Sequence, residues 1–202
     1  VDMVKEKLIS KKEAVLRIDP HSLDTLLHPT LDEKSPINVI ANGLPASPGA
    51  ASGKVVFSSE EAERLTSMMQ DTILVRVETS PEDIQGMHAA KGILTARGGM
   101  TSHAAVVARG MGRPCVSGSS EIDINYENRT FKTSSTEIKE GDIITIDGST
   151  GRIIEGSVAT VKPEISGDFS KLMSWADSYR KLIIRTNSET PKDTKTAKDF
   201  GA

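Results

Sequence analysis

The chain has 202 residues and a net charge of −3, with 26% charged side chains, which is the balance of an ordinary water-soluble protein. Hydrophobic residues make up 37%, enough for one good core, and because only 3% are aromatic that core must be aliphatic. The sequence has no basic block of the kind that indicates nucleic-acid binding, and none of its apolar runs approaches the roughly 18 to 20 residues of a membrane span. A single cysteine excludes an internal disulfide framework. We therefore expect a cytoplasmic protein without nucleic-acid or membrane partners.

The first 36 residues predict helices followed by a linker. Ser10 and Glu13 form a capping-box pattern ahead of one helix, and Asp19-Pro20 opens a second helix over 22–27. Residues 30–36 are polar, flanked by proline and without periodicity, which indicates a linker. Because the chain starts without methionine and inside a helical pattern, we expect a piece of a longer protein.

From residue 37 to 157, short apolar runs alternate with short helical patterns, which predicts an α/β domain. Residues 43–53 are rich in glycine, proline and small residues, so we expect turns there; they lack the spacing of a phosphate loop. Met68 and Met69 are expected to fill the core. Strands are predicted at 39–40, 54–57, 72–77, 92–95, 114–116, 122–124, 129–133, 143–146 and 152–154, and helices at 59–69, 81–88 and 103–108.

Residues 156–167 are loose and polar and predict a second linker. A helix over 168–180, a strand over 182–185 and a helix over 192–200 follow. Trp175 lies off the apolar stripe of the first of these helices, so we expect it to contact a neighbouring element. One strand–helix unit cannot bury its own apolar faces, so we expect it to belong to a larger α/β domain.

The stretch from 98 to 118, GGMTSHAAVVARGMGRPCVSG, is the most informative in the chain. Hydroxyl residues precede His103, and an apolar helical run follows it and stops at Arg109-Gly110. The pattern places His103 in the first turn of a helix that Thr101 or Ser102 caps. Free amide groups and the helix dipole make such a turn an anion site. A nucleophilic imidazole beside an anion site suggests a histidine that receives a phosphoryl group.

Histidine suits a reversible carrier, since an ordinary pKa of about 6.5 leaves the neutral nucleophile available at pH 7. Passing the group through a phosphoramidate divides one hard transfer into two easier ones. Gly98 and Gly99 leave room for a phosphoryl donor. Thr101 and Ser102 either cap the helix or hold the imidazole in one tautomer. Arg109, six positions after the histidine, is expected to act structurally or to pair with another domain.

Other reactive residues carry weaker signals. Cys115 lies in a predicted strand without a histidine near it in sequence, so a buried thiol is expected. Asp147 fits turn chemistry better than metal binding. His21, His28 and His88 are isolated, and we expect surface, cap or core positions for them. The spacing of these residues predicts no metal site.

The 98–118 stretch resembles the phosphohistidine motif of phosphoenolpyruvate-utilising enzymes. Met100, the Ala-Ala-Val-Val run and the GMG and PCVSG segments favour the dikinase branch of that family. The likeness extends over essentially the whole chain, through ISKKEAVLRIDPHSLDTLLHPT, GLPASPGAASGKVVF, IDGSTG and IRTNSETPKDTKTAKDFGA. The residues that carry the shared core of the motif are Gly98, Gly99, Thr101, Ser102, His103, Ala108 and Arg109.

The resemblance implies an α/β fold in three parts. Residues 37–157 match a β/β/α phosphohistidine domain that swivels between two remote active sites. Residues 1–36 match a helical segment and linker leaving the nucleotide-binding half of the enzyme. Residues 158–202 match a linker helix and the first strand–helix unit of a C-terminal TIM-type barrel, which binds phosphoenolpyruvate or pyruvate.

The resemblance also implies a kinase-type transferase reaction, in which ATP, phosphate and pyruvate give AMP, diphosphate and phosphoenolpyruvate. His103 matches the histidine that carries the group as tele-phosphohistidine. Thr101 matches a threonine that some plant relatives phosphorylate for inactivation. Mg²⁺ is implied for the whole enzyme and is bound, like ATP, phosphate and pyruvate, by other domains. The whole enzyme is expected to be a homodimer, and this chain alone is expected to be inactive.

Two alternatives remain open. Within the family, phosphoenolpyruvate synthase differs in that its ATP half-reaction does not depend on phosphate. Outside enzymes, a non-catalytic phosphocarrier or regulatory module would pass phosphate between separate proteins.

Overall fold

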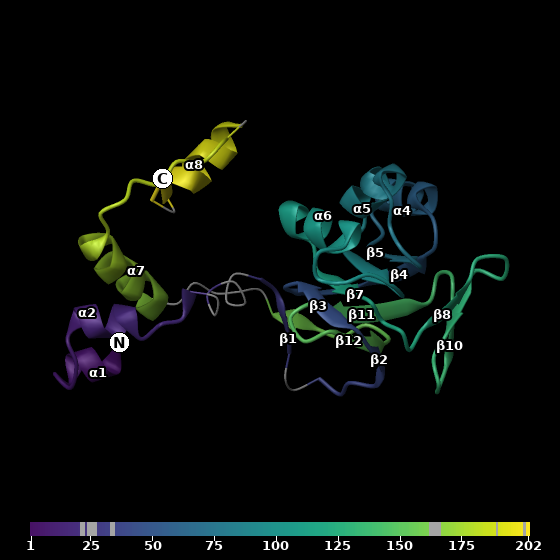
Figure 1. Ribbon diagram of the computed structural model, residues 1–202, viewed down its shortest axis with the longest axis horizontal. Coiled ribbons are helices and arrows are strands. Elements are labelled where there is room, and N and C mark those ends of the chain that lie inside the picture. Colours follow the sequence, from purple (N-terminus) through teal and green to yellow (C-terminus); the bar gives the residue numbers. More distant parts are fainter. Residues whose placement is uncertain (21–22, 24–27, 33–34, 162–166, 189, 200) are drawn as a thin grey trace. The chain divides into compact units, whose positions relative to one another are not determined.

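The computed structural model describes residues 1–20, 23, 28–32, 35–161, 167–188, 190–199 and 201–202. These residues form two compact units, one over 20–163 and one that joins 1–19 to 164–202 (Figure 1). The predicted helix at 22–27 and His21 fall almost entirely outside the described residues. The predicted domain boundaries after residues 36 and 157 stay predictions.

The larger unit is built on an eight-stranded sheet in the order β2-β12-β11-β4-β5-β6-β7-β3. The strands from β4 to β7 are parallel, and the other pairs are antiparallel. β2 and β3 are the two edge strands of this order, yet only Gly43 separates them in the chain. The sheet therefore curls so that its two edges come together. The strands are β2 (Val39–Asn42), β3 (Leu44–Ser47), β4 (Ala50–Val56), β5 (Thr72–Arg76), β6 (Gly92–Thr95), β7 (Cys115–Ser117), β11 (Ile143–Asp147) and β12 (Arg152–Glu155).

Three helices cover one face of this sheet (Figure 1). They are α4 (Ser59–Ser67), α5 (Ile84–Ala89), which follows a 3₁₀ turn over Pro81–Asp83, and α6 (His103–Met111). Successive strand residues point to opposite faces. In β5, Ile73 and Val75 therefore pack inside the curled sheet, while Leu74 packs under the helices. The fold is mixed α/β with two cores, consistent with the predicted β/β/α class.

A three-stranded antiparallel sheet closes the inner core, to which it contributes Phe131 and Ile138. Its strands are β8 (Asp123–Asn125), β9 (Thr130–Lys132) and β10 (Glu137–Lys139), and the first two agree with the strands predicted at 122–124 and 129–133.

The two predicted linkers are wrong in part, because they pair with each other. β1 (Thr30–Leu31) forms an antiparallel pair with β13 (Thr160–Val161). The amide of Asp32 also donates to the carbonyl of Ala159. Sequence reasoning missed this pair because neither segment has apolar alternation, and each finds its partner about 130 residues away along the chain.

The turns expected over 43–53 are also largely wrong, since β3 and most of β4 lie there. Glycine at position 53 allows close packing: a Cβ atom there would lie 2.8 Å from the backbone of Thr72. Met68 and Met69 are not core residues, because 52% and 95% of their surfaces are exposed. They lie after the end of α4, where the backbone of Met69 turns left-handed.

The second unit contains α1 (Asp2–Lys5), α2 (Lys11–Leu16), α7 (Gly167–Tyr179) and α8 (Pro191–Asp199). The capping box of Ser10 and Glu13 is confirmed. Trp175 contacts a neighbouring element as expected, since the ammonium of Lys11 lies 5.8 Å from its ring centroid.

The strand predicted over 182–185 is wrong: these residues form no strand, and the side chains of Leu182 and Ile183 are 83% and 87% exposed. The assignment of 158–202 to a barrel stays a prediction. Among the described residues, no helix is both long enough and apolar enough to cross a membrane.

Candidate functional site

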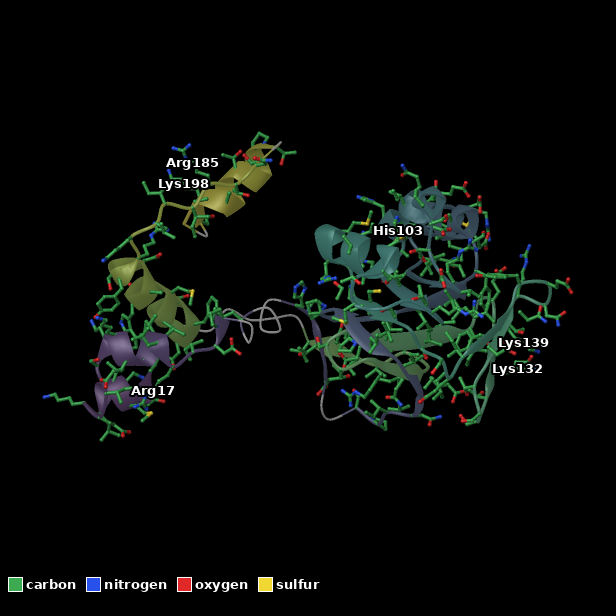
Figure 2. All side chains as sticks on the ribbon, viewed as in Figure 1. Arg17, His103, Lys132, Lys139, Arg185 and Lys198 are labelled. Atoms are coloured by element: carbon green, nitrogen blue, oxygen red, sulfur yellow. The ribbon has the colours of Figure 1, made fainter. Side chains whose placement is uncertain are left out.

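His103 is the first residue of α6 (Figure 2) and so lies in the first turn, as predicted. Ser102 is the cap. The hydroxyl of Ser102 accepts a hydrogen bond from the amide of Ala105 at 3.4 Å. Thr101 is exposed in the turn before it. The helix does not stop at Arg109-Gly110; it continues to Met111 and ends at Gly112, which adopts the left-handed conformation that closes many helices.

The imidazole of His103 is held by Thr79. Oγ1 of Thr79 lies 2.9 Å from Nδ1 of His103, whereas Nε2 has no hydrogen-bond partner among the described residues. His103 and Thr79 are both partly exposed. Hydrogen bonding of one ring nitrogen sets the tautomer, so this contact distinguishes Nδ1 from an available Nε2.

Thr79 was missed by sequence reasoning, which expected Thr101 or Ser102 either to cap the helix or to hold the ring. A signal was present in the strand order. β5 and β6 are parallel neighbours, so the residues after their carboxyl ends meet at one sheet edge. Thr79 follows β5, and the segment leading to His103 follows β6.

The glycine pair before the helix has two different environments. Gly98 has φ of +108°, and a Cβ atom there would lie 2.9 Å from Cβ of Ser102, so only glycine fits without strain. Gly118 is packed against the carbonyl of Gly98 in the same way. A Cβ atom at Gly99 would meet nothing within 4 Å, so that side of the loop is open.

Arg109 binds the backbone of the motif itself. Its Nε donates to the carbonyl of Ala105 at 3.1 Å, and its Nη2 donates to the carbonyl of Met100. The guanidinium thus ties the loop before His103 to the second turn of α6. This contact favours the structural role over the pairing with another domain.

The other reactive residues lie apart from this histidine. Cys115 is fully buried in β7, and burial raises the pKa of its thiol to about 12. Asp147 stabilises the turn that follows β11, as expected: its carboxylate accepts hydrogen bonds from the amide of Ser149 at 3.0 Å and from Arg152 Nη2 at 2.9 Å. His88 is exposed, and His28 is partly exposed. Among the described residues, no three His, Cys, Asp or Glu side chains gather closely enough to hold a metal ion.

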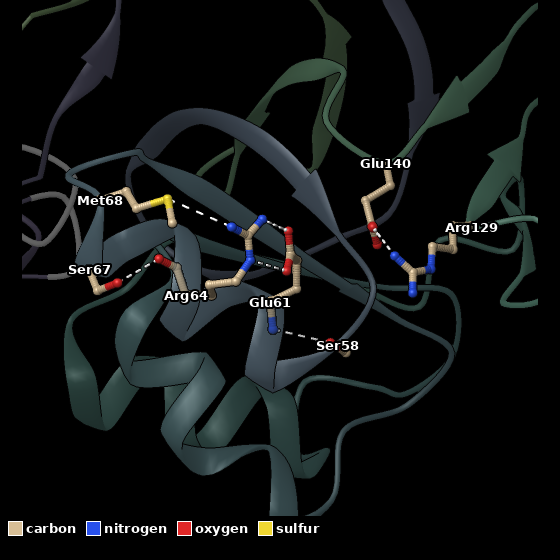
Figure 3. Close-up of polar contacts among 7 residues, drawn as sticks. All are labelled: Ser58, Glu61, Arg64, Ser67, Met68, Arg129 and Glu140. Atoms are coloured by element: carbon tan, nitrogen blue, oxygen red, sulfur yellow. Dashed lines mark hydrogen bonds and ion pairs between the residues drawn. The ribbon is translucent and has the colours of Figure 1, made fainter.

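A cleft of about 530 Å³ opens where β4 and β5 end, between α4 and the three-stranded sheet. Its walls carry two ion pairs, which Figure 3 shows: Arg64 with Glu61 at 2.6 Å and Arg129 with Glu140 at 2.8 Å. Hydrogen bonds from the Arg64 guanidinium, aided by its charge, lower the pKa of the Glu61 carboxyl. The cations of this cleft are thus already matched by carboxylates.

Residues 68–151 match the family described as "PEP-utilising enzyme, mobile domain". The resemblance drawn from the motif is thereby confirmed.

Curated relatives that match over the whole of this chain are pyruvate, phosphate dikinases. The chain is 59% identical over 202 residues to the enzyme of Rhizobium meliloti, and 55% identical over 203 residues to that of Clostridium symbiosum. A chloroplastic enzyme of Flaveria pringlei is 52% identical. All of this chain is covered, but it spans only 22%, 23% and 21% of the three relatives. One solved structure, the N-terminal domain of Enzyme 1 - Nitrogen, is 24% identical over 52% of this chain and 37% of that one, with a TM-score of 0.28.

Proposed function

We propose that this chain is the phosphohistidine carrier of a pyruvate, phosphate dikinase, with His103 as the nucleophile. The observation that supports this most strongly is the contact between Thr79 Oγ1 and Nδ1 at 2.9 Å. A carrier histidine needs one unprotonated nitrogen that faces the donor. The contact occupies Nδ1 and leaves Nε2 for the phosphoryl group.

In the reactive tautomer, Nδ1 carries the proton, and this N–H donates a hydrogen bond to Oγ1 of Thr79. The lone pair of Nε2 then forms the bond to phosphorus while the bond from phosphorus to the donor oxygen breaks. The leaving oxygen keeps the electron pair. The ring becomes an imidazolium that the Thr79 oxygen stabilises by accepting from Nδ1–H, and return of the group to an acceptor reverses each step.

The surroundings of His103 support the same reaction. The first-turn amides of α6 and the positive end of its dipole favour negative charge close to the histidine. The open side of Gly99 leaves a donor space to approach. Ser102 and Arg109 fix the start of the helix and the loop before it, so they position the imidazole without touching the phosphoryl group.

The whole reaction is part of this proposal. ATP, phosphate and pyruvate would be converted to AMP, diphosphate and phosphoenolpyruvate, with each small molecule bound outside this chain. Mg²⁺ would also be bound there, and this chain alone would not turn over. Homodimer formation and phosphorylation of Thr101 as an inactivating switch remain expectations carried from the resemblance.

The carrier role is tested on the chain itself with phosphoramidate, a small phosphoryl donor. The P–N bond of phosphoramidate breaks, ammonia leaves, and Nε2 gains the phosphoryl group. We expect one phosphohistidine by ³¹P and ¹⁵N NMR at alkaline pH, on Nε2 of His103, and none in His103→Gln. Modification on another histidine, or on Nδ1, contradicts the proposal.

The reaction is tested by replacing the matching segment of the Rhizobium meliloti enzyme with this chain. We expect the chimaera to form phosphoenolpyruvate from pyruvate, ATP and phosphate, and its His103→Ala variant to be inactive. An ATP half-reaction that proceeds without phosphate would favour the synthase instead. A folded, phosphorylatable chimaera that makes no phosphoenolpyruvate would favour the non-catalytic carrier.

A further inference from the structure

Seven arginines lie in the unit over 20–163, and six of them use their guanidinium groups on partners within it. Arg97 is the exception: its side chain is exposed, and no hydrogen bond or ion pair of that side chain is found among the described residues. The six are paired with carboxylates, namely Arg64, Arg76, Arg129 and Arg152, or donate to backbone carbonyls, namely Arg109 and Arg113.

The backbone of Arg97 is fixed although its side chain is free. Its amide donates to the carbonyl of Val77 at 2.9 Å, and its carbonyl accepts from the hydroxyl of Thr95 at 2.8 Å. These hydrogen bonds continue the pairing of β5 and β6 as far as residue 97. The side chain of Arg97 therefore projects from a fixed backbone position.

Two observations bring the backbone of Arg97 close to the segments that carry His103 and Thr79. First, Gly98 packs closely on Ser102, because a Cβ atom at Gly98 would lie 2.9 Å from Cβ of Ser102. Arg97 directly precedes Gly98 and His103 directly follows Ser102, so the same contact brings Arg97 and His103 towards each other. Neighbouring Cα atoms are about 3.8 Å apart, so an extended arginine side chain can span the remaining gap.

Second, the amide of Arg97 is hydrogen-bonded to the carbonyl of Val77, and Val77 lies two residues before Thr79, which holds the imidazole. Strand alternation agrees with this placement. Leu94 and Ala96 pack in the inner core, so Arg97 has the parity of the opposite face, where the helical layer lies.

We propose that Arg97 binds the phosphoryl group carried on Nε2 of His103. This inference rests on the proposed carrier function and adds the residue that neutralises the carried charge. A guanidinium offers two parallel donors to phosphoryl oxygens, and it is less strongly hydrated than an ammonium. An arginine near the histidine that has no other partner would partly neutralise the charge of the phosphoryl group while the loaded domain moves between sites.

The test is the titration of the phosphoryl group in the phosphoramidate-loaded chain, followed by ³¹P NMR. A nearby cation favours the dianion, so Arg97→Gln should raise the pKa of the phosphoryl group by about 1 unit relative to the unsubstituted chain. Arg97→Lys keeps the charge without the fork and should give a smaller rise. Arg64→Gln is the matched control, because Arg64 is an exposed arginine paired with Glu61, and it should not change the titration.

Coincident titration curves for the unsubstituted chain and Arg97→Gln would overturn the role of Arg97 and leave phosphorylation of His103 standing. An equal shift in Arg64→Gln would also overturn it, because the effect would then be one of net charge. If the unsubstituted chain forms no phosphohistidine, the carrier function itself fails. Amide spectra of each variant check that the fold is retained, and the lysine variant provides the comparison if the glutamine variant unfolds.

Discussion

Oγ1 of Thr79 lies 2.9 Å from Nδ1 of His103, although 24 residues separate them in the chain. The hydroxyl follows β5 and the imidazole begins α6, so the parallel sheet brings together two groups that no local pattern connects. The contact divides the two ring nitrogens by function. One nitrogen is used for orientation, and the other is available for chemistry.

Removing that hydroxyl should slow phosphorylation of His103 and reduce its selectivity for Nε2. A hydrogen bond of this kind contributes about 0.5–1.5 kcal/mol, so Thr79→Val should lower the rate with phosphoramidate roughly three- to tenfold. Thr79→Ser keeps the hydroxyl and should stay close to the unsubstituted rate. Imidazole ¹⁵N shifts report the tautomer directly. Equal rates and tautomers in the valine and serine variants would remove Thr79 from the site.

The start of α6 was predictable because its determinants are local. A hydroxyl cap, an apolar helical run and a histidine between them specify where the helix begins, and Ser102 and His103 occupy those places. β5 and β6 were predictable for a similar reason, since each is a short run of apolar residues that the structure buries completely or nearly so.

The remainder depends on partners far away in the chain. The pairing of Thr30–Leu31 with Thr160–Val161 requires the whole domain to fold between them. The strand content of 43–53 is hidden by glycine and proline, whose local preference is for turns, until neighbouring strands supply hydrogen bonds. Residues 182–185 show the opposite failure: an apolar β-branched run predicts a strand, but the described residues supply it with no neighbour.

The two glycines before the histidine should respond differently to alanine. Gly98→Ala must adopt a positive φ and approach Ser102, so we expect a loss of about 1–3 kcal/mol in the free energy of unfolding. Gly99→Ala meets open space and should stay within about 0.5 kcal/mol. Urea unfolding measures both. Equal losses at the two positions would show that the loop does not have this conformation in solution.

Thr145 should prove essential for holding the chain that leaves β12. Its buried hydroxyl donates to the carbonyl of Gly156 at 2.8 Å, accepts from the amide of Val158 at 3.0 Å and lies 2.7 Å from the hydroxyl of Ser52. Thr145→Val would leave buried polar groups unpaired, at a cost of about 1–3 kcal/mol.

Hydrogen exchange at the amide of Val158 separates this local effect from a general one. It should accelerate more in Thr145→Val than the loss of global stability requires. Thr66→Val is the matched control, because that exposed hydroxyl makes a single bond to the carbonyl of Ala89, and its effect should be small. Unchanged protection of Val158 would mean that residues 156–158 are held by other contacts.

Cys115 should be unreactive while the chain is folded. It is the single cysteine, it is fully buried under the helical layer, and burial raises the pKa of its thiol from 9.0 to about 12, against a small opposing effect of Arg109. The folded state therefore favours the neutral thiol. This contribution to stability is fully present below pH 9 and is lost as the pH rises towards 12, because the unfolded thiol ionises first.

Alkylation by iodoacetamide at pH 8 tests this expectation. We expect labelling at least about a hundredfold slower in buffer than in denaturing urea, since it must await an opening of the fold. The rate in urea controls for the intrinsic reactivity of the thiol. Fast labelling of the native chain, with a rate that follows an ordinary thiol titration, would show that the packing of β7 against α6 opens readily and that Cys115 is not sealed in the core.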